Sequence, residues 1–394
     1  MALAVLDFDI DHLPERLDLK QGQEGALILL RIDDVPCGQA LLWQDARDHE
    51  APLRERLLRA ANSSFWERWL ERELGITHPD PAPATLPTAT VVICTRDRTE
   101  DLELCLAGLH AMPGQPDILV IDNAPSTDGT EKLVARYPTV RYVLEPRPGL
   151  DVARNTAIRN TSNEIIAFID DDAVPDAMWL HNLLRNFDDP MVLAAGGLTM
   201  ALELDAPAQM AFQRVGGFSR GFKRFTYDAM TTNPFDAWHA AAGVNLAIRR
   251  SAADIIGLFD EALDAGTLSC AGGDTDYCRR ILAAGYRIAY DPQALNWHRH
   301  RRSMQELQRQ IYGYECAFFA MLTKSIFFER NPKALMRGLT WLRHHIPSLA
   351  RSLRQQQHRT LPFNVAWTQT KGALAGPGRY LRARRVAAQY RKRA

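Results

Sequence analysis

Three consecutive aspartates, Asp170, Asp171 and Asp172, directly follow the apolar run IIAFI at residues 165–169. Along an extended chain alternate side chains share a side, so Asp170 and Asp172 are expected to project together and Asp171 to oppose them. Adjacent carboxylates repel one another, and a divalent cation relieves that repulsion. Their oxygens favour Mg²⁺ or Mn²⁺, ions that complete their coordination with phosphate oxygens and water. The triplet therefore predicts a metal site; the alternative is an exposed acidic turn ahead of Pro175.

A second acidic cluster, Gly272-Gly273-Asp274-Thr275-Asp276, opens a predicted helix further along the chain. The two glycines free the loop to approach a ligand closely. A carboxylate there can act as a general base that takes a proton from an attacking hydroxyl. Acids in a first helical turn also serve as plain capping and dipole partners. Further on, His298 follows a strand-like segment, where it either completes the coordination of the metal or lies on the surface.

The pattern between residues 88 and 302 predicts the scaffold that positions these side chains. Continuous apolar runs, typical of strands buried on both faces, alternate there with helical spacing. This order predicts a mostly parallel α/β sheet with helices on both faces, whose ligands bind beyond the carboxyl ends of the strands. The predicted strands are 89–94, 118–121, 140–144 and 165–169, and the predicted helices are 101–110, 130–137, 152–160 and 175–187.

Three of the predicted strands end in polar residues. The first is followed by Thr95-Arg96-Asp97-Arg98, the second by Asp122-Asn123 and the fourth by the aspartate triplet. Each set alone is compatible with an ordinary turn, but together they predict one ligand site at a single edge of the sheet. Arg96, Arg98 and Arg154 are candidates for holding a nucleotide or adding fixed positive charge, with a surface position as the alternative.

The sequence on either side of this domain predicts two further regions. Residues 1–76 form a small module of a hairpin, with apolar runs at 26–32 and 39–43, and a helical segment at 51–74. Residues 77–87 contain four prolines, which disfavour both helix and strand and predict a stiff linker. Residues 303–394 are predicted to form a helical, basic C-terminal extension.

The charge of the chain is distributed unevenly, although its formal net charge is zero. From residue 331 to residue 394 there is no aspartate or glutamate, whereas the lysines and arginines number fourteen. Such one-sided charge attracts polyanions: anionic lipid headgroups, a phosphorylated acceptor, an acidic partner or nucleic acid. No aromatic-interleaved recognition module accompanies the charge, so nucleic acid is not expected. The remaining alternative is a solvated tail.

Several other features bear on the class of protein and its location. The six cysteines are scattered without paired metal-ligand spacing, as expected for reduced thiols in the cytosol. The first residues lack the basic and apolar regions of a secretory signal. No run reaches the roughly 18 apolar residues that a spanning helix needs. We therefore expect a cytoplasmic protein, with an anionic membrane surface at the inner face as a candidate partner of the basic region.

The chain resembles the inverting glycosyltransferases of family 2, which have the GT-A fold. The resemblance covers roughly residues 87–302 and rests on six motifs in the family's order. They are TVVICTRDRTEDLELCLAGL, ILVIDNAPSTDGT, EPRPGLDVARNTAI, IIAFIDDDAVPDAMWL, AAGVNLAIRRSAADIIGLFDEAL and GGDTDYCRRILAAGYRIAYDPQALNWHRHRR. Single pieces are weak signals, whereas six in order are highly specific.

The resemblance implies roles for individual residues. It places Thr95, Arg96, Asp122 and Asn123 around the nucleotide base, Arg154 and Asn155 near the nucleotide, and Asp170 and Asp171 near the ribose and the metal shell. It implies Asp172 and His298 as metal contacts and Asp274 as general base. Where the family often has Glu-Asp, this chain has Gly273-Asp274, which leaves Asp276 as a competing base.

The implied reaction transfers a sugar from a nucleoside-diphosphate sugar, expected to be a UDP-sugar, to an acceptor hydroxyl with inversion. The implied cofactor is Mn²⁺ or Mg²⁺, the acceptor a saccharide or lipid-linked molecule, and the setting the synthesis of cell-surface polysaccharide or glycolipid. One alternative, a sugar-phosphate nucleotidyltransferase, needs a glycine-rich loop after the first strand, but CTRDRTED has no glycine. The other, a non-catalytic nucleotide-sugar-binding protein, is disfavoured by the intact Asp172 and Asp274.

Overall fold

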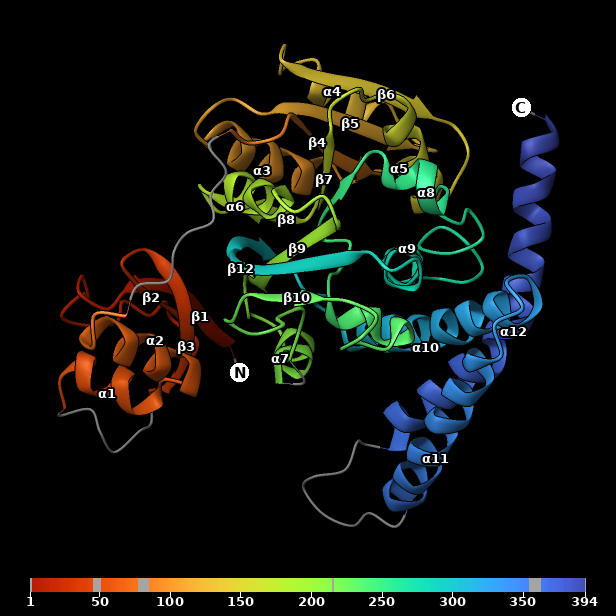
Figure 1. The fold of residues 1–394 in the computed structure, drawn as a ribbon. Coiled ribbons are helices and arrows are strands. Elements are labelled where there is room, and N and C mark those ends of the chain that lie inside the picture. The colour runs from red at the N-terminus through yellow and green to blue at the C-terminus, as the bar shows by residue number, and fades with distance from the viewer. Residues whose placement is uncertain (1, 45–50, 77–84, 215, 354–362, 394) are drawn as a thin grey trace.

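The computed structural model describes the chain except for residues 1, 45–50, 77–84, 215, 354–362 and 394. Its centre is a nine-stranded sheet in which neighbouring strands follow the order β10-β12-β9-β11-β7-β4-β5-β6, with β8 paired to β12 (Figure 1). A three-stranded sheet lies at the N-terminal end and three long helices at the C-terminal end. The predicted fold class, an α/β domain flanked by a small α+β module and a helical region, is confirmed.

One half of the central sheet is the predicted alternation of strands and helices. Its strands β4, β5, β6 and β7 pair in parallel. Successive side chains of β4 enter opposite cores, with Val91 and Ile93 on one face and Val92 on the other. The elements are β4 (Ala89–Thr95), α3 (Thr99–His110), β5 (Asp117–Asn123), α4 (Gly129–Val134), β6 (Val140–Glu145), α5 (Leu150–Arg159) and β7 (Ile165–Asp170).

The helix predicted at 175–187 is shorter than expected. Its first residue, Pro175, instead ends β8 (Ala173–Pro175), which pairs with β12 antiparallel. A helix then runs over α6 (Trp179–Leu184) and continues as the 3-10 turn η1 (Arg185–Phe187). The extended chain after the aspartate triplet thus joins the sheet before the helix begins.

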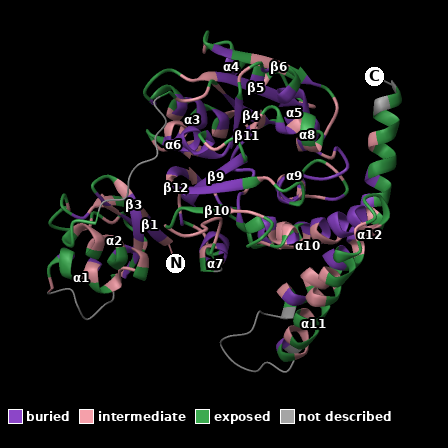
Figure 2. Cartoon of the chain, in the orientation of Figure 1, coloured by how far each residue is buried: buried purple, intermediate pink, exposed green. Residues whose placement is uncertain are grey.

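The other half of the sheet is of mixed direction. Strand β11 runs antiparallel to both β7 and β9, whereas β12 runs parallel to β9. Figure 2 shows that the central strands are largely buried. The elements are β9 (Val192–Ala201), α7 (Pro207–Arg214), β10 (Phe225–Tyr227), η2 (Pro234–His239), β11 (Asn245–Arg249), α8 (Ala252–Ile256), α9 (Gly273–Ala283) and β12 (Arg287–His298).

The N-terminal module contains the predicted hairpin, β2 (Gln23–Ile32) and β3 (Val35–Trp43). An unpredicted strand, β1 (Ala2–Asp9), pairs with β2 in parallel, and the helical segment forms α1 (Leu53–Ala60) and α2 (Ser63–Glu73). The module docks on the central domain: the Leu3 amide donates to the Leu204 carbonyl at 2.9 Å, and an Arg31–Asp176 ion pair spans 2.6 Å. Most of the predicted proline linker, 77–84, lies outside the described residues.

Three helices make up the C-terminal region, as predicted. They are α10 (Met304–Phe327), α11 (Lys333–Leu353) and α12 (Phe363–Arg393). A capping box fixes the start of α10, because the Ser303 hydroxyl accepts from the Glu306 amide at 3.2 Å while the Glu306 carboxylate accepts from the Ser303 amide. Among the described residues, none of the helices combines the length and apolarity needed to cross a bilayer.

Candidate metal and acid–base site

The register of the strands gathers the predicted polar residues at one edge of the sheet. At the carboxyl end of β4, Cys94 pairs with Asp170 of β7 and Thr95 with Asp122 of β5. Strand β11 runs the other way, so its first residue, Asn245, lies beside Ile169 at the same edge. The predicted meeting of the three polar strand ends is therefore what the structure shows.

Asp170, Asp172 and His298 form a group whose ligand atoms all lie within 4.8 Å of one another. His298 is the last residue of β12 and pairs with Ala173, immediately after the triplet. Its Nε2 lies 2.9 Å from an Asp172 oxygen and 4.0 Å from an Asp170 oxygen. The Asp172 and His298 side chains are buried, whereas that of Asp170 is 38% exposed. The group thus has one open side.

Asp171 points to different partners, as the alternation of side chains predicts. The Thr95 hydroxyl donates to one of its oxygens at 2.7 Å, and Arg98 donates to the other at 2.8 Å. Arg98 also reaches an Asp172 oxygen at 2.8 Å and Asp101 at 2.9 Å. This single guanidinium therefore fixes the backbone loop after β7 against the start of α3.

The electrostatics of the triplet differ from residue to residue. Burial and the neighbouring aspartates raise the pKa of Asp171 to about 7, against the opposing influence of Arg98. Burial and Asp172 also raise the pKa of Asp170. Burial acts the same way on Asp172, but His298 and Arg98 outweigh it and hold its pKa below the ordinary value. Ionising all three aspartates together is therefore unfavourable without a further cation.

The donor set fits a divalent cation. Two carboxylates and one imidazole lie within a span that a single ion can bridge, and oxygen-rich sets favour Mg²⁺ or Mn²⁺. Nδ1 of His298 is buried and has no hydrogen-bond partner among the described residues, and the Phe218 ring packs edge-on against the imidazole at 5.0 Å. The ring is thus oriented by packing, with Nε2 turned toward the carboxylates.

Asp274 lies in the first turn of α9 and is only partly buried. The Gly243 amide donates to its Oδ2 at 2.6 Å, and the Thr275 amide donates to its Oδ1 at 2.7 Å. Gly243 lies just before β11, so the contact holds this carboxylate at the sheet edge that carries the triplet. A side chain at position 243 would meet Arg154, because a Cβ there would lie 2.4 Å from its Nη2.

Arg154 interacts electrostatically with both acidic regions of the site. It is buried and donates to Asp151 at 2.9 Å and to Asp264 at 2.5 Å. Its charge lowers the pKa of Asp170 and also interacts with Asp274. The structure therefore places Arg154 among protein carboxylates rather than at an open surface.

Gly273, the departure from the family pattern, is explained by its neighbour Asp151. A Cβ at position 273 would lie 2.0 Å from an Asp151 oxygen, so the Asp151 carboxylate fills the space that a side chain would need. Burial and Asp264 raise the pKa of Asp151 well above the ordinary value. The position where the family often has a glutamate is thus lined by a carboxylate from α5.

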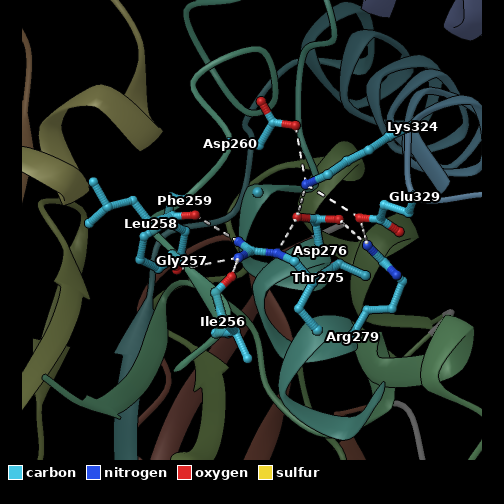
Figure 3. Close-up of polar contacts among 12 residues, drawn as sticks. Ile256, Gly257, Leu258, Phe259, Asp260, Thr275, Asp276, Arg279, Lys324 and Glu329 are labelled. Carbon is cyan, nitrogen blue, oxygen red and sulfur yellow. Dashed lines mark hydrogen bonds and ion pairs between the residues drawn. The ribbon is translucent and has the colours of Figure 1, made fainter. Parts of the chain in front are cut away.

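Asp276, two residues beyond Asp274, lies in a network of charged side chains (Figure 3). Its side chain is fully buried and accepts from Arg279 at 2.9 Å, Arg280 at 2.9 Å and Lys324 at 2.6 Å. Burial acts to raise its pKa, but these three cations outweigh burial and hold the pKa far below the ordinary value. Asp276 therefore ties α9 to α10.

The remaining residues predicted to bind the nucleotide differ in how exposed their side chains are. Arg96 is half exposed, with Asp97 3.7 Å away. Asp122 is buried, accepts from the Tyr142 hydroxyl at 2.9 Å and keeps its Oδ1 without a partner among the described residues. Asn123 spans the Arg147 carbonyl and the Gly149 amide, and Asn155 clamps the backbone of Phe259. Arg96 is exposed to a ligand, whereas Asp122 is enclosed and Asn123 and Asn155 shape loops.

Sequence reasoning missed several residues of the site. Arg301 lies 3.9 Å from Asp172, Asp101 pairs with Arg98, and Phe218 packs on His298. Lys324 carried a readable signal, since it is the charge that interrupts the apolar stretch 316–328. In the structure this lysine donates to Asp276 at 2.6 Å.

Comparison with known proteins finds similarity over part of the chain. Residues 90–256 match the family described as Glycosyl transferase family 2. A curated relative, Glycosyltransferase AglE of Haloferax volcanii, is 26% identical over 236 residues, 58% of this chain and 72% of the relative. The Pre-mycofactocin glycosyltransferase of Mycobacterium tuberculosis is 27% identical over 255 residues, 63% of this chain and 51% of the relative, so this chain spans about half of that protein.

Among solved structures, the mannosyltransferase PcManGT from Pyrobaculum calidifontis, in complex with GDP-Man and Mn²⁺, aligns with a TM-score of 0.49 and 20% identity. The alignment covers 83% of this chain and 94% of that one. The sheet described above, parallel around β4 with β11 inserted antiparallel and helices on both faces, agrees with the GT-A arrangement that the resemblance implies.

Proposed function

We infer that this chain is a glycosyltransferase of family 2, and we propose that it moves a sugar from a nucleoside-diphosphate sugar to an acceptor hydroxyl with inversion. The observation that carries the proposal is the grouping of Asp170, Asp172 and His298 within 4.8 Å at the sheet edge to which Gly243 also fixes Asp274. An ion site and an accessible base at one edge are the two parts that this transfer requires.

In the proposed reaction, the acceptor oxygen forms a bond to the anomeric carbon while the bond from that carbon to the diphosphate breaks. The electron pair of the broken bond leaves with the nucleoside diphosphate, and the acceptor proton passes to Asp274. A single in-line displacement of this kind inverts the anomeric centre. The amides of Gly243 and Thr275 hold the Asp274 carboxylate in place for this proton transfer.

Asp170, Asp172 and His298 are the residues proposed to hold Mn²⁺ or Mg²⁺. When bound, such a cation neutralises charge that collects on a diphosphate. The half-exposed Arg96 and the nearby Arg301 add fixed positive charge on the protein side. Asp122 is proposed to lie near the nucleotide base, because it lies at the end of β5 beside Thr95 at the same sheet edge.

Of the two candidate bases, Asp274 is the better supported. Asp276 is fully buried against three cations, which hold its carboxylate ionised and leave no room for an acceptor. Asp274 is partly exposed, and its partners are two backbone amides and one hydroxyl. A general base must reach the proton it removes, and the contacts favour Asp274 on that ground.

The proposal extends to setting and donor. A UDP-sugar is the proposed donor, and a saccharide or lipid-linked molecule in cell-surface polysaccharide or glycolipid synthesis is the proposed acceptor. The fourteen basic residues and absent acids between 331 and 394 support a peripheral position on an anionic membrane at its cytoplasmic face.

The test is the Asp274→Asn variant, assayed for transfer and for donor binding. Loss of the base should reduce the transfer rate about 10²- to 10⁴-fold. Mn²⁺-dependent binding of the nucleoside-diphosphate sugar, measured by calorimetry, should stay close to that of the wild type, because Asn keeps the shape of the side chain. Asp254→Asn is the matched control, since Asp254 is an exposed acid in the first turn of α8.

Two outcomes would contradict the proposal. Equal loss of transfer and donor binding would remove Asp274 from the role of base. Absence of Mn²⁺-dependent hydrolysis of every nucleotide-sugar by the wild type would instead favour a protein that only binds its ligand.

A further inference from the structure

Helix α11 exposes a continuous row of large apolar side chains. The row, called here the α11 stripe, consists of Leu335, Leu339, Leu342 and Ile346, which are 58%, 51%, 41% and 59% exposed. Their spacing of four, three and four residues places them on one face of the helix. Exposed apolar side chains scattered singly are ordinary, but an aligned row of this length marks a contact surface.

The orientation of the stripe is fixed by the neighbouring face of α11, about 100° around the helix axis. There the Trp341 indole donates to Glu315 of α10 at 3.0 Å, and His345 lies 2.9 Å from the Thr370 hydroxyl of α12. Ala334 is completely buried on the same side. Because α10 and α12 hold these residues, the stripe faces outward, on a helix that projects away from the central sheet (Figure 1).

The charge around the stripe identifies the class of surface that it fits. Lys333, Arg343 and Arg351 are exposed on the same helix, and no acidic residue occurs from 331 to 394. A helix that combines an apolar face with basic residues on its remaining surface and is too polar to span a bilayer binds in the interface of anionic lipid membranes. An acidic protein would satisfy the charges but would leave the aligned leucines without a matching apolar layer.

We propose that α11 lies flat in the headgroup region of an anionic bilayer, with the α11 stripe inserted among the acyl chains and the basic side chains at the lipid phosphates. This inference rests on the peripheral position included in the proposed function and assigns it to one face of one helix. Apolar insertion and electrostatic attraction then act together, so neither suffices alone for stable binding.

The experiment compares two double variants of the full chain in sedimentation with vesicles. Leu335→Gln/Leu339→Gln removes half of the stripe and leaves every charge in place. Leu70→Gln/Leu74→Gln is the matched control, because these leucines have the same spacing and are 58% and 64% exposed near the end of α2. The vesicles contain phosphatidylcholine, alone or mixed with phosphatidylglycerol.

We expect the wild type and the control to bind the mixed vesicles and to bind pure phosphatidylcholine weakly. The stripe variant should bind mixed vesicles at least about tenfold less tightly, with an unchanged melting temperature and unchanged donor hydrolysis in solution. Ile346→Gln, which alters the other end of the stripe, should show a smaller loss in the same direction.

Three results would overturn the inference. Undiminished binding by the stripe variant would show that the charges alone hold the protein, and the peripheral position would stand. No binding of the wild type to mixed vesicles would refute the position as well. Lipid-free self-association that only the stripe variant loses would assign the stripe to a second copy of this chain. Donor hydrolysis in the same samples tests the glycosyltransferase reaction separately.

Discussion

The aspartate triplet and Asp276 are both acidic clusters at ends of secondary structure, yet their surroundings differ. At the triplet, three carboxylates share Arg98 and His298, and one of them, Asp170, remains substantially exposed. At Asp276, one fully buried carboxylate meets three cations within hydrogen-bond distance. Asp170 leaves the first cluster open to a ligand, whereas the Asp276 carboxylate is enclosed and its cations have Glu329 and Asp260 as further partners.

This difference distinguishes a ligand site, the triplet, from a structural contact between two helices, the Asp276 network, which is called the joint here. A buried charge is tolerated when partners neutralise it, and the complete pairing of Asp276 fastens α9 to α10. Incomplete pairing at the triplet is tolerated only at a cost that a bound cation relieves. The joint nevertheless serves the site, because α9 also carries Asp274, the proposed base.

The largest expected effect is a loss of transfer activity when the triplet, and not Asp276, is altered. Asp172→Asn removes a proposed ion ligand and should lower the transfer rate about 10²- to 10³-fold, as loss of one preorganised electrostatic contact does. Calorimetric titration with Mn²⁺ and donor should show the matching loss of affinity. The melting temperature should fall as well, because the buried His298 loses its partner at 2.9 Å, although Arg98 keeps Asp171 and Asp101.

Asp188→Asn, at an exposed position on the same domain, is the control for that experiment. Unchanged Mn²⁺-dependent donor binding by Asp172→Asn would remove the triplet from the ion site and erase the distinction between the clusters.

The next effect concerns stability. Asp276→Asn leaves Arg280 without its carboxylate partner, while Arg279 keeps Glu329 and Lys324 keeps Asp260. Breaking a buried pair costs up to about 3–5 kcal/mol in free energy of unfolding. Chemical denaturation should show this loss, while Asp254→Asn should unfold like the wild type. Mn²⁺-dependent donor binding by the folded variant should persist. A variant that is fully stable but inactive would make Asp276 the base and contradict our assignment.

The sequence predicts much of the triplet and little of the joint, because the two depend on contacts of different range. Strand β7 and its polar end are adjacent in the chain, so the apolar run and the alternation of side chains predict where Asp170 and Asp172 point. Asp276 is defined by Lys324, which is 48 positions away. Without the contact from Lys324 of α10, an acid in a first helical turn has several equally simple explanations.

Two other positions show the same limit. Arg154 has the residue type of a phosphate ligand, but the structure surrounds it with Asp151 and Asp264. Gly273 departs from the family pattern for a reason that only the fold supplies, since the Asp151 carboxylate occupies its side-chain space. The local sequence pattern predicts which residues lie at the sheet edge. The residues that pair with them come from segments distant in the chain, which the pattern does not reveal.

The smallest expected effect is a pair of opposite pH dependences in metal-free protein. The pKa of Asp276 is lowered on folding, so its stabilisation is present above the ordinary value of 3.8 and is lost as the pH falls below it. The pKa of Asp171 is raised to about 7, so its ionisation costs stability as the pH rises from 3.8 toward 7. Melting temperatures with chelator should therefore show Asp276→Asn approaching the wild type in acid, and Asp171→Asn gaining on the wild type as the pH rises.

Parallel curves for the two variants would contradict this pair of signs. Because both substitutions replace a carboxylate by an amide of similar shape, differences in packing largely cancel between them. What remains is the sign of the charge balance at each cluster. Added Mn²⁺ should reduce the pH dependence for Asp171 and leave that for Asp276 unchanged, because only the triplet has the open ligands through which an ion can bind.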